Sequence, residues 1–177
     1  MKAKLVYESL EDIFKPKSEE NIEKDIKNNP KYKNLINFYE KIKQLEYDIS
    51  LTSFLTLKNK LSFPVSYSGH NLISNTLDIF SNWTKNVKTE YFNLRVQLIL
   101  DFKNKEIKGI GEVTINKVFD WNYIYKNTYD LIGTSEKEII SSLNDAYDDV
   151  VSNIEYNDDV FRDGLDEIYI RNGDDFY

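Results

Sequence analysis

The stretch from Phe92 to Asn116, FNLRVQLILDFKNKEIKGIGEVTIN, decides the fold of this chain. Its first half, as far as Phe102, alternates apolar and polar residues without a break, which is the period of a strand with one buried face. If Asn104-Lys105 forms a two-residue turn, the return strand places Ile107 opposite Phe102. Apolar residues then meet on one face and opposite charges on the other, so the sequence predicts a β-hairpin at about 91–116.

Apolar residues at helical spacing predict helices on both sides of this hairpin. The clearest helix begins with the capping box of Ser135 and Glu138, in which each residue satisfies a backbone donor at the start of the helix. The pattern from Asp120 to Leu131 is aromatic and ambiguous. The expected helices span about 31–49, 71–88 and 136–155.

A second hairpin is predicted at about 51–67, where apolar and polar residues alternate on either side of Lys58-Asn59-Lys60. Together these elements predict an α+β fold. Its antiparallel sheet would consist of two hairpins, about 51–67 and 91–116, packed against the three helices.

The 177 residues are expected to form one domain with an extension at each end. Residues 1–29, here called the N-terminal arm, contain two short helical patterns that end at prolines. Helices this short are marginal in water, so the arm should order only by docking on the body or on a partner. Residues 30–156 form the α+β domain, and residues 157–177 form an acidic C-terminal tail.

Composition excludes several kinds of protein. The chain has no Cys and one His, which excludes disulfides, a thiol nucleophile and a zinc site made from Cys or from several His of one chain. No apolar run approaches the roughly 18 residues of a membrane span, and the first residues lack the apolar core of a secretory signal. We therefore expect a cytoplasmic protein that does not bind membranes.

Charge is unevenly distributed along the chain. The net charge is −7, and residues 121–177 hold 14 acidic residues against four basic ones. The field of this last third should repel nucleic acid and anionic lipid. Direct binding of nucleic acid through the C-terminal third is therefore not expected.

Gly109-Ile110-Gly111 is similar to part of a phosphate-binding loop, but no third Gly follows and the segment lies within a predicted strand. In the predicted register both glycines face the buried side of the hairpin. We expect that they make room for large Leu side chains or for a closely packed helix.

His70 is the only imidazole, and so the only side chain whose ordinary pKa lies near neutrality. As a general base it would need an orienting carboxylate, for which Asp78 and Asp101 are the nominees. A loop histidine beside a helix start is more often a surface or capping residue. We expect no catalytic residue in this chain.

A dense carboxylate group near the C-terminus invites a calcium hypothesis, but its spacing does not fit an EF-hand. Counted from Asp159, position three is Phe161 and position twelve is Ile170. A solvated acidic segment is the preferred interpretation, so we expect no metal and no cofactor. The members of the group are Asp158, Asp159, Asp163, Asp166 and Glu167.

Two segments are candidates for binding a protein partner. The chain closes with Asp174-Asp175-Phe176-Tyr177, which is similar to the acidic-aromatic tips of single-stranded-DNA-binding proteins that recruit partners. A frayed terminus is the alternative. In the N-terminal arm, Leu10, Ile13 and Phe14 lie at helical spacing and offer an apolar face.

The opening Met1-Lys2-Ala3-Lys4-Leu5-Val6-Tyr7-Glu8-Ser9-Leu10, continued by Phe14-Lys15-Pro16-Lys17-Ser18, resembles the start of many small uncharacterised proteins of tailed bacteriophages with AT-rich genomes, including crAss-like gut phages. The resemblance covers about the first 18 residues. It implies a phage-encoded protein made in the bacterial cytoplasm, and it brings no site residue with it.

The sequence therefore favours a non-enzymatic phage structural or assembly protein, such as a connector, tail-completion or ring subunit of the virion, whose partners are other copies of itself or other phage proteins. The alternative is an acidic protein-binding module or inhibitor that engages a basic host or phage protein through its C-terminal third. An enzyme that encloses a small ligand between helices and sheet is the third hypothesis.

Overall fold

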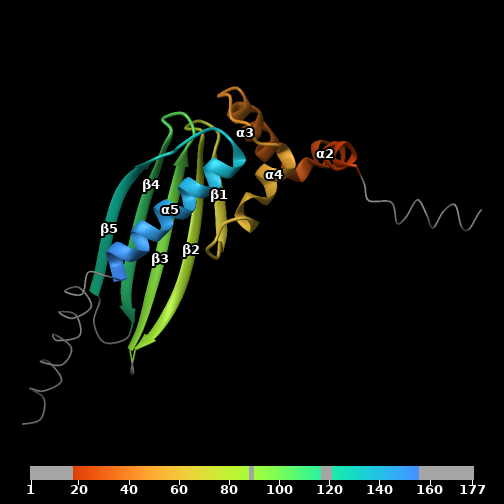
Figure 1. Ribbon diagram of the computed structural model, residues 1–177. Coiled ribbons are helices and arrows are strands. Elements are labelled where there is room, and N and C mark those ends of the chain that lie inside the picture. Colours follow the sequence, from red (N-terminus) through yellow and green to blue (C-terminus); the bar gives the residue numbers. More distant parts are fainter. Residues whose placement is uncertain (1–17, 88–89, 117–120, 156–177) are drawn as a thin grey trace, which may run out of the picture.

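The computed structural model describes residues 18–87, 90–116 and 121–155, and these residues have the predicted α+β fold. Five antiparallel strands form one sheet in the order β1-β2-β3-β4-β5. Helix α5 crosses one face of the sheet, and the shorter helices gather at one end (Figure 1). In chain order the elements are α2 (Glu19–Lys27), η1 (Pro30–Tyr32), α3 (Lys33–Lys43), α4 (Leu51–Thr56), η2 (Leu57–Asn59), β1 (Tyr67–Asn71), β2 (Thr76–Val87), β3 (Glu90–Asp101), β4 (Glu106–Asn116), β5 (Trp121–Asp130) and α5 (Glu136–Glu155).

The central hairpin of β3 and β4 is confirmed, but its predicted register is wrong by two residues. Ile107 lies opposite Leu100 rather than Phe102, and the turn is four residues long. A shift of two residues keeps every side chain on its predicted face, because side chains alternate with a period of two. The pattern of the sequence therefore identified the faces but could not distinguish these two registers.

The longer turn is stabilised by the side chain of Asp101. Its carboxylate accepts hydrogen bonds from the backbone N–H groups of Lys103 and Asn104 at 3.1 and 3.0 Å, and from Asn104 Nδ2 at 2.8 Å. Lys105 closes the turn in the left-handed region, with φ of 55°. These bonds satisfy the backbone N–H groups of Lys103 and Asn104, which lie in the turn and outside the β3–β4 ladder.

The hairpin predicted at 51–67 is wrong, because this segment begins with helix α4 and η2. The second hairpin of the sheet is formed instead by β1 and β2. Ser50 caps α4, because its hydroxyl accepts a hydrogen bond from Ser53 N at 3.1 Å. Short apolar runs such as Leu51 to Leu57 fit a helix and a strand equally well, and here the cap favours the helix.

The predicted helix at 71–88 is wrong, since most of this segment is strand β2. Its Leu77 and Ile79 are buried and alternate with half-buried Asp78 and Phe80. The strand pairs with β3 over its whole length, from Thr76 opposite Asp101 onward. Pairing with the long edge of β3 satisfies the backbone of β2 and outweighs its helical spacing.

Two of the predicted helices are confirmed, one of them in shortened form. Helix α5 has the predicted bounds 136–155, but the helix predicted at 31–49 ends at Lys43. Glu46 then takes φ of 66°, which a helix cannot continue. Tyr47 and Ile49 are still buried, so the connection supplies core residues that the helix was expected to supply.

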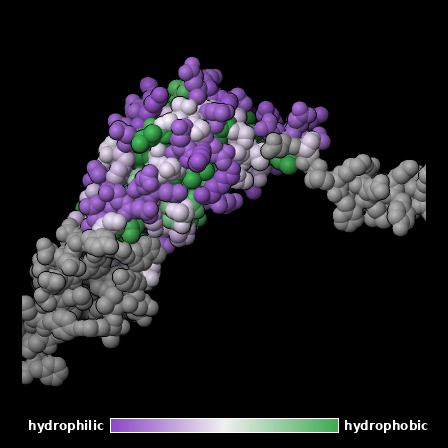
Figure 2. Space-filling view, in the orientation of Figure 1, coloured by the Kyte–Doolittle hydropathy of each residue, from purple (hydrophilic) through white to green (hydrophobic). Residues whose placement is uncertain are grey.

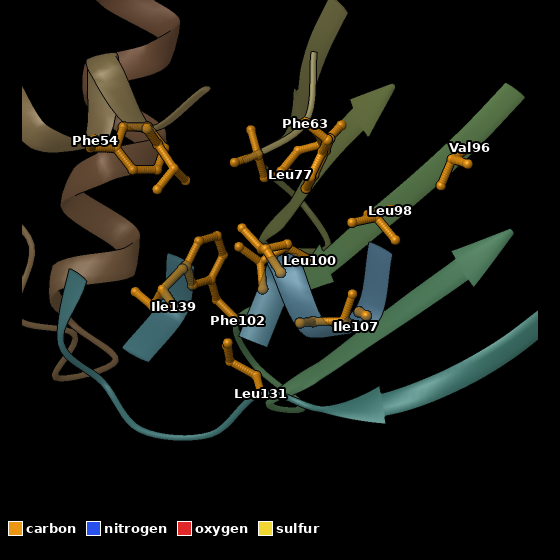
Figure 3. Packing of buried hydrophobic residues seen from close by; sticks show 14 of the residues in the cluster. Phe54, Phe63, Leu77, Val96, Leu98, Leu100, Phe102, Ile107, Leu131 and Ile139 are labelled. Carbon is orange, nitrogen blue, oxygen red and sulfur yellow. The ribbon is translucent and has the colours of Figure 1, made fainter. Parts of the chain in front are cut away.

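The core lies between α5, the shorter helices and one face of the sheet, here called the inner face (Figure 3). Gly109 and Gly111 of β4 lie on this face, opposite Leu98 and Val96. A Cβ at Gly109 would be 2.7 Å from Val150 Cγ2, which confirms that a closely packed helix requires these glycines.

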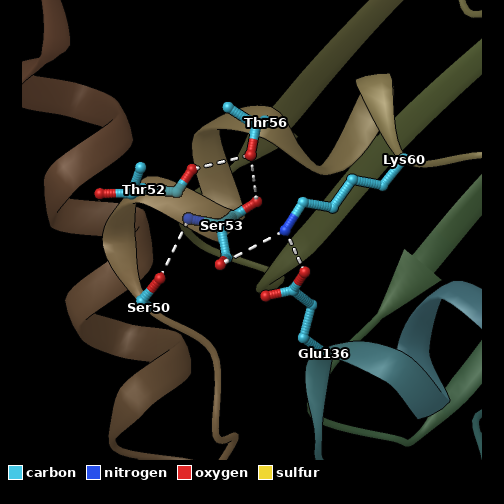
Figure 4. Close-up of polar contacts among 6 residues, drawn as sticks. All are labelled: Ser50, Thr52, Ser53, Thr56, Lys60 and Glu136. Carbon is cyan, nitrogen blue, oxygen red and sulfur yellow. Dashed lines mark hydrogen bonds and ion pairs between the residues drawn. The ribbon is translucent and has the colours of Figure 1, made fainter. Parts of the chain in front are cut away.

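A polar contact joins the shorter helices to the start of α5 (Figure 4). Lys60 forms an ion pair with Glu136 and also lies 3.5 Å from the hydroxyl of Ser53. This ion pair lowers the pKa of Glu136. The contact is exposed, so it orients α4 against α5 more than it stabilises the fold.

The surface in the view of Figure 2 is mainly hydrophilic, with hydrophobic residues in small separate patches. None of the helices in the described ranges has the length and apolar character needed to cross a membrane. Helix α2 lies where the N-terminal arm was predicted to be helical. The rest of the arm, to residue 17, and the predicted tail 157–177 lie outside the described residues.

Candidate protein-binding groove

An apolar groove of about 560 Å³ lies between α2, η1, α4 and strand β2. We call it the α2–α4 groove. Chain segments that are far apart in the sequence meet in it, because α2 and β2 are separated by more than 40 residues. Its lining residues are Ile22, Ile26, Lys31, Tyr32, Leu35, Thr52, Phe54, Leu55, Thr56, Leu57, Lys58, Leu77 and Ile79.

Local capping positions the helices that form the groove. The Asn29 side chain accepts a hydrogen bond from Lys31 N at 3.0 Å and so begins η1, with Pro30 at its first position. On the other side, Ser50 caps α4, and the Thr56 hydroxyl donates back to Thr52 O at 3.0 Å. Asn29 and Ser50 each lie within two residues of a residue that lines the groove.

The chemistry of the groove is that of a binding site for apolar side chains. Buried Phe54, Leu77 and Ile79 form its floor, and half-buried Ile22 and Ile26 form the wall of α2. A second hollow of about 280 Å³ adjoins it and is lined by the same two isoleucines. Helix α2 therefore has open space on two sides, where a further apolar segment could pack.

Two exposed cations, Lys31 and Lys58, lie on the lining of the groove. Such a rim favours a segment that combines apolar residues with carboxylates. This groove was not predicted from the sequence. Its only trace in the sequence is the second short helical pattern of the N-terminal arm, which contains Ile22 and Ile26.

The structure does not bring His70 together with either nominated carboxylate. His70 lies on β1 rather than in a loop, on the inner face, where its ring is 5.4 Å from the ring of Phe38. Asp78 and Asp101 have the opposite parity and lie on the outer face of the sheet. Burial raises the pKa of Asp78. The Asp101 carboxylate accepts hydrogen bonds from the turn between β3 and β4.

A polar contact missed by the sequence analysis joins α5 to β5. Asp149 accepts hydrogen bonds from the hydroxyls of Tyr129 at 2.7 Å and Tyr125 at 3.4 Å. Burial first, and then the hydrogen bond to Asp149, raise the pKa of Tyr129 far above its ordinary value. A phenol held this firmly in its protonated form is a structural donor rather than an acid catalyst.

The outer face of the sheet carries a polar hollow of about 340 Å³ around Asn82, Thr84, Arg95 and Glu112. The Asn82 amide donates to Ser66 Oγ at 3.1 Å, and the Thr84 hydroxyl donates to the Asn93 side chain at 2.8 Å. Asn82 and Thr84 therefore lie on strand β2, within the segment that was predicted to be a helix.

Other predicted candidates cannot be placed. Leu10, Ile13 and Phe14, the carboxylate group at 158–167 and the terminal Asp174, Asp175, Phe176 and Tyr177 all lie outside the described residues. Within the described residues, no group of three or more His, Asp or Glu side chains could hold a metal ion.

No family model matches the chain, and neither a curated protein nor a solved structure matches it.

Proposed function

We propose that this chain is a non-enzymatic, phage-encoded structural or assembly protein that binds other copies of itself through the α2–α4 groove. The groove is the observation that carries the proposal. The resemblance of the first 18 residues to phage proteins supports the origin. The proposed role is that of a connector, tail-completion or ring subunit, made in the bacterial cytoplasm and assembled into the virion.

The proposed occupant of the groove is residues 8–14 of a neighbouring copy. This segment, ESLEDIF, combines apolar Leu10, Ile13 and Phe14 with three carboxylates. Its apolar residues match the floor of the groove, and its carboxylates match the two lysines on the lining. Residues 8–14 are therefore proposed as the occupant on two grounds, their apolar side chains and their negative charge.

The proposal takes this segment from a neighbouring copy, and the disulfide test below distinguishes that arrangement from a segment that covers the groove of its own copy.

A contact between the segment of one copy and the groove of the next is heterologous, so repeated contacts close into a ring or extend as a filament. The second candidate function, an acidic module that engages a basic protein, is favoured by Asp145 and Asp148, which are exposed on α5. Binding of that kind should weaken steeply with salt, whereas an apolar groove should retain its occupant.

Intermolecular disulfide formation tests the proposed function, because the chain has no Cys of its own. A Phe14→Cys chain and a differently tagged Leu55→Cys chain are mixed and oxidised. Leu55 lines the groove, so we expect a mixed disulfide between the two chains. Ile73→Cys is the control, since Ile73 is 93% exposed in the turn between β1 and β2 and lies outside the groove.

Absence of the mixed disulfide would overturn the proposal. So would a disulfide that forms only within a single chain carrying both substitutions, because the segment would then cover the groove of its own copy.

A further inference from the structure

Strand β5 is a long edge strand. It spans 10 residues and pairs with β4 on one side, from Trp121 opposite Ile115 to Asp130 opposite Glu106. Among the described residues no strand pairs with its other side. The strand contains no proline, and its only lysine is Lys126. An edge of this length is a template for a further strand.

The hydrogen-bonding groups on the free edge belong to the even-numbered residues of β5. Leu131 N donates to Lys105 O at 2.8 Å, which places the odd-numbered positions in the ladder with β4. By the alternation of an antiparallel ladder, the even-numbered positions direct their N–H and C=O groups away from β4. The N–H of Thr128 has no partner in β4: it donates to the Asn127 side chain at 2.9 Å, a bond that pairing with a second strand would replace.

The same edge carries exposed apolar side chains. Ile124 on β5 is 51% exposed and Ile132, two residues beyond the strand, is 70% exposed. The third large exposed apolar residue among the described ones is Ile73, at the opposite edge of the sheet. Ile124 thus adds an exposed apolar side chain to the free edge, and Ile132 lies just beyond the end of the strand.

We propose that two copies of this chain associate through antiparallel pairing of their β5 strands, with Thr128 of one copy opposite Thr128 of the other. The interface is isologous, and its two-fold axis passes through Thr128, near the C-terminal end of β5, so that residues 126–130 of the two strands pair. The two sheets then form one continuous sheet. This interface is independent of the groove and goes beyond the proposed function.

The register follows from the side chains on the outer face. Centring on Thr128 places Lys126 opposite Asp130 of the other copy, twice by symmetry. A register centred on Lys126 would place that lysine opposite its own copy. A register centred on Asn127 would place Ile124 opposite Asp130. Of these three registers, only the one on Thr128 pairs opposite charges.

The proposed partner also balances a row of acidic side chains within one copy. Asp101, Glu106 and Asp130 lie side by side across β3, β4 and β5. Like charges opposite one another destabilise a sheet. Lys126 of the second copy would place a cation at the end of this row. Within the described part of one copy, neither Lys126 nor Asp130 forms an ion pair.

The two α5 helices would lie on the same side of the joined sheet, where the acidic Asp145 and Asp148 oppose association. Each helix lies over the β4 strand of its own copy. In the joined sheet, three strand spacings, about 14 Å, separate the two β4 strands. Both side chains are exposed, so salt at physiological ionic strength weakens the repulsion between them. We therefore expect the pairing to persist at physiological ionic strength.

The first test is again disulfide formation, now at the two-fold axis. In the full chain, Thr128→Cys should give a covalent dimer on oxidation, because directly paired Cα atoms lie at about 5.5 Å, within reach of a disulfide. Lys103→Cys, exposed in the turn between β3 and β4, is the control and should give none.

The second test is specific for the register. Lys126→Asp alone places like charges opposite each other twice and should raise the dimer dissociation constant at least about tenfold, as should Asp130→Lys. The double variant K126D/D130K restores opposite charges and should recover the dimer. Lys103→Asp makes the same change of charge away from the edge and should leave the dissociation constant unchanged. Thermal transitions establish that each variant is folded.

A monomer at all concentrations, with no covalent dimer of Thr128→Cys, would overturn the proposal; it would mean that another segment covers the edge. A dimer that neither single charge reversal weakens would overturn it as well. Failure of the double variant to recover the dimer would overturn the register.

Discussion

At the scale of single residues, the closeness of α5 to the sheet depends on two positions of β4 that carry no side chain. A Cβ at Gly111 would lie 2.1 Å from Ile154 Cδ1 and 2.8 Å from Val150 Cγ1. The helix could accept such an atom only by moving away from β4, which would open a tightly packed part of the core. The glycines that are similar to a phosphate loop are thus packing residues.

Gly111→Ala is expected to lower the free energy of unfolding by about 1–3 kcal/mol, the usual cost of overpacking a core. Ile154→Val removes the atom nearest to the new methyl group and should by itself cost about 0.5–1.5 kcal/mol. The double variant should be less destabilised than the sum of the two single effects, because the smaller side chain at 154 makes room for the added methyl group at 111. Chemical denaturation of the four proteins measures this as a double-mutant cycle, and purely additive effects would contradict the packing role.

At the scale of elements, the start of α5 has one half of the predicted capping box, in which Glu138 reaches back to the backbone, whereas the Ser135 hydroxyl donates to Glu138. Glu138 Oε2 accepts hydrogen bonds from the Ser135 hydroxyl at 2.6 Å, from Ser135 N at 3.0 Å and from Thr134 N at 3.2 Å. The hydroxyl contributes most, and together the three donors lower the pKa of Glu138 below its ordinary value of 4.5. The carboxylate thereby stabilises the helix start only while it is ionised.

Glu138→Gln should therefore reduce stability at neutral pH but not in acid. A lowered pKa in the folded state contributes stability that is present above about pH 4.5 and is lost as the pH falls through the folded value. Thermal unfolding of both proteins from neutral pH into acid measures the difference, which should shrink on acidification. Ser135→Ala removes the strongest donor to Glu138. In a chain with this substitution, Glu138→Gln should therefore cost less stability at neutral pH. Parallel curves at every pH would rule out this role.

Strand β2 shows that an element can be determined by its neighbour. Its apolar residues have helical spacing, yet the segment is a strand because β3 offers an unpaired edge of the same length. The hydrogen bonds of Asn71 assist the reversal before it, since its side chain accepts from Ile73 N at 2.9 Å and Ser74 N at 3.2 Å. Tertiary pairing thus overrides the local pattern.

At the scale of the whole molecule, the two proposed interfaces lie on different parts of the protein. The α2–α4 groove is formed by the shorter helices and β2, whereas the free edge of β5 is the opposite side of the sheet. The β5 contact is two-fold and stops at a dimer, while the contact in the groove repeats from copy to copy. Each can therefore be removed without the other.

Deleting residues 1–17 should lower the solution mass to that of a dimer at most and leave the thermal transition unchanged, because α2 and the core remain. Deleting residues 1–29 should also lower the transition temperature, because it removes half-buried Ile26 from the core. Each kcal/mol lost corresponds to about 2–4 °C in a protein of this size. Light scattering and thermal unfolding of the three chains measure these effects. An unchanged mass after the shorter deletion would contradict the role of residues 8–14.

The sequence by itself determined the elements whose signals are local. The alternation of β3 and β4, the capping box and apolar stripe of α5, and the two glycines under that helix were all readable from neighbouring residues, and so was the α+β fold class. Only the tertiary structure decided the rest. The register of β3 and β4 is ambiguous in steps of two residues, and β2 is a strand because of its partner. The groove unites residues from Ile22 to Ile79, whose proximity arises from packing and leaves no periodic trace in the sequence.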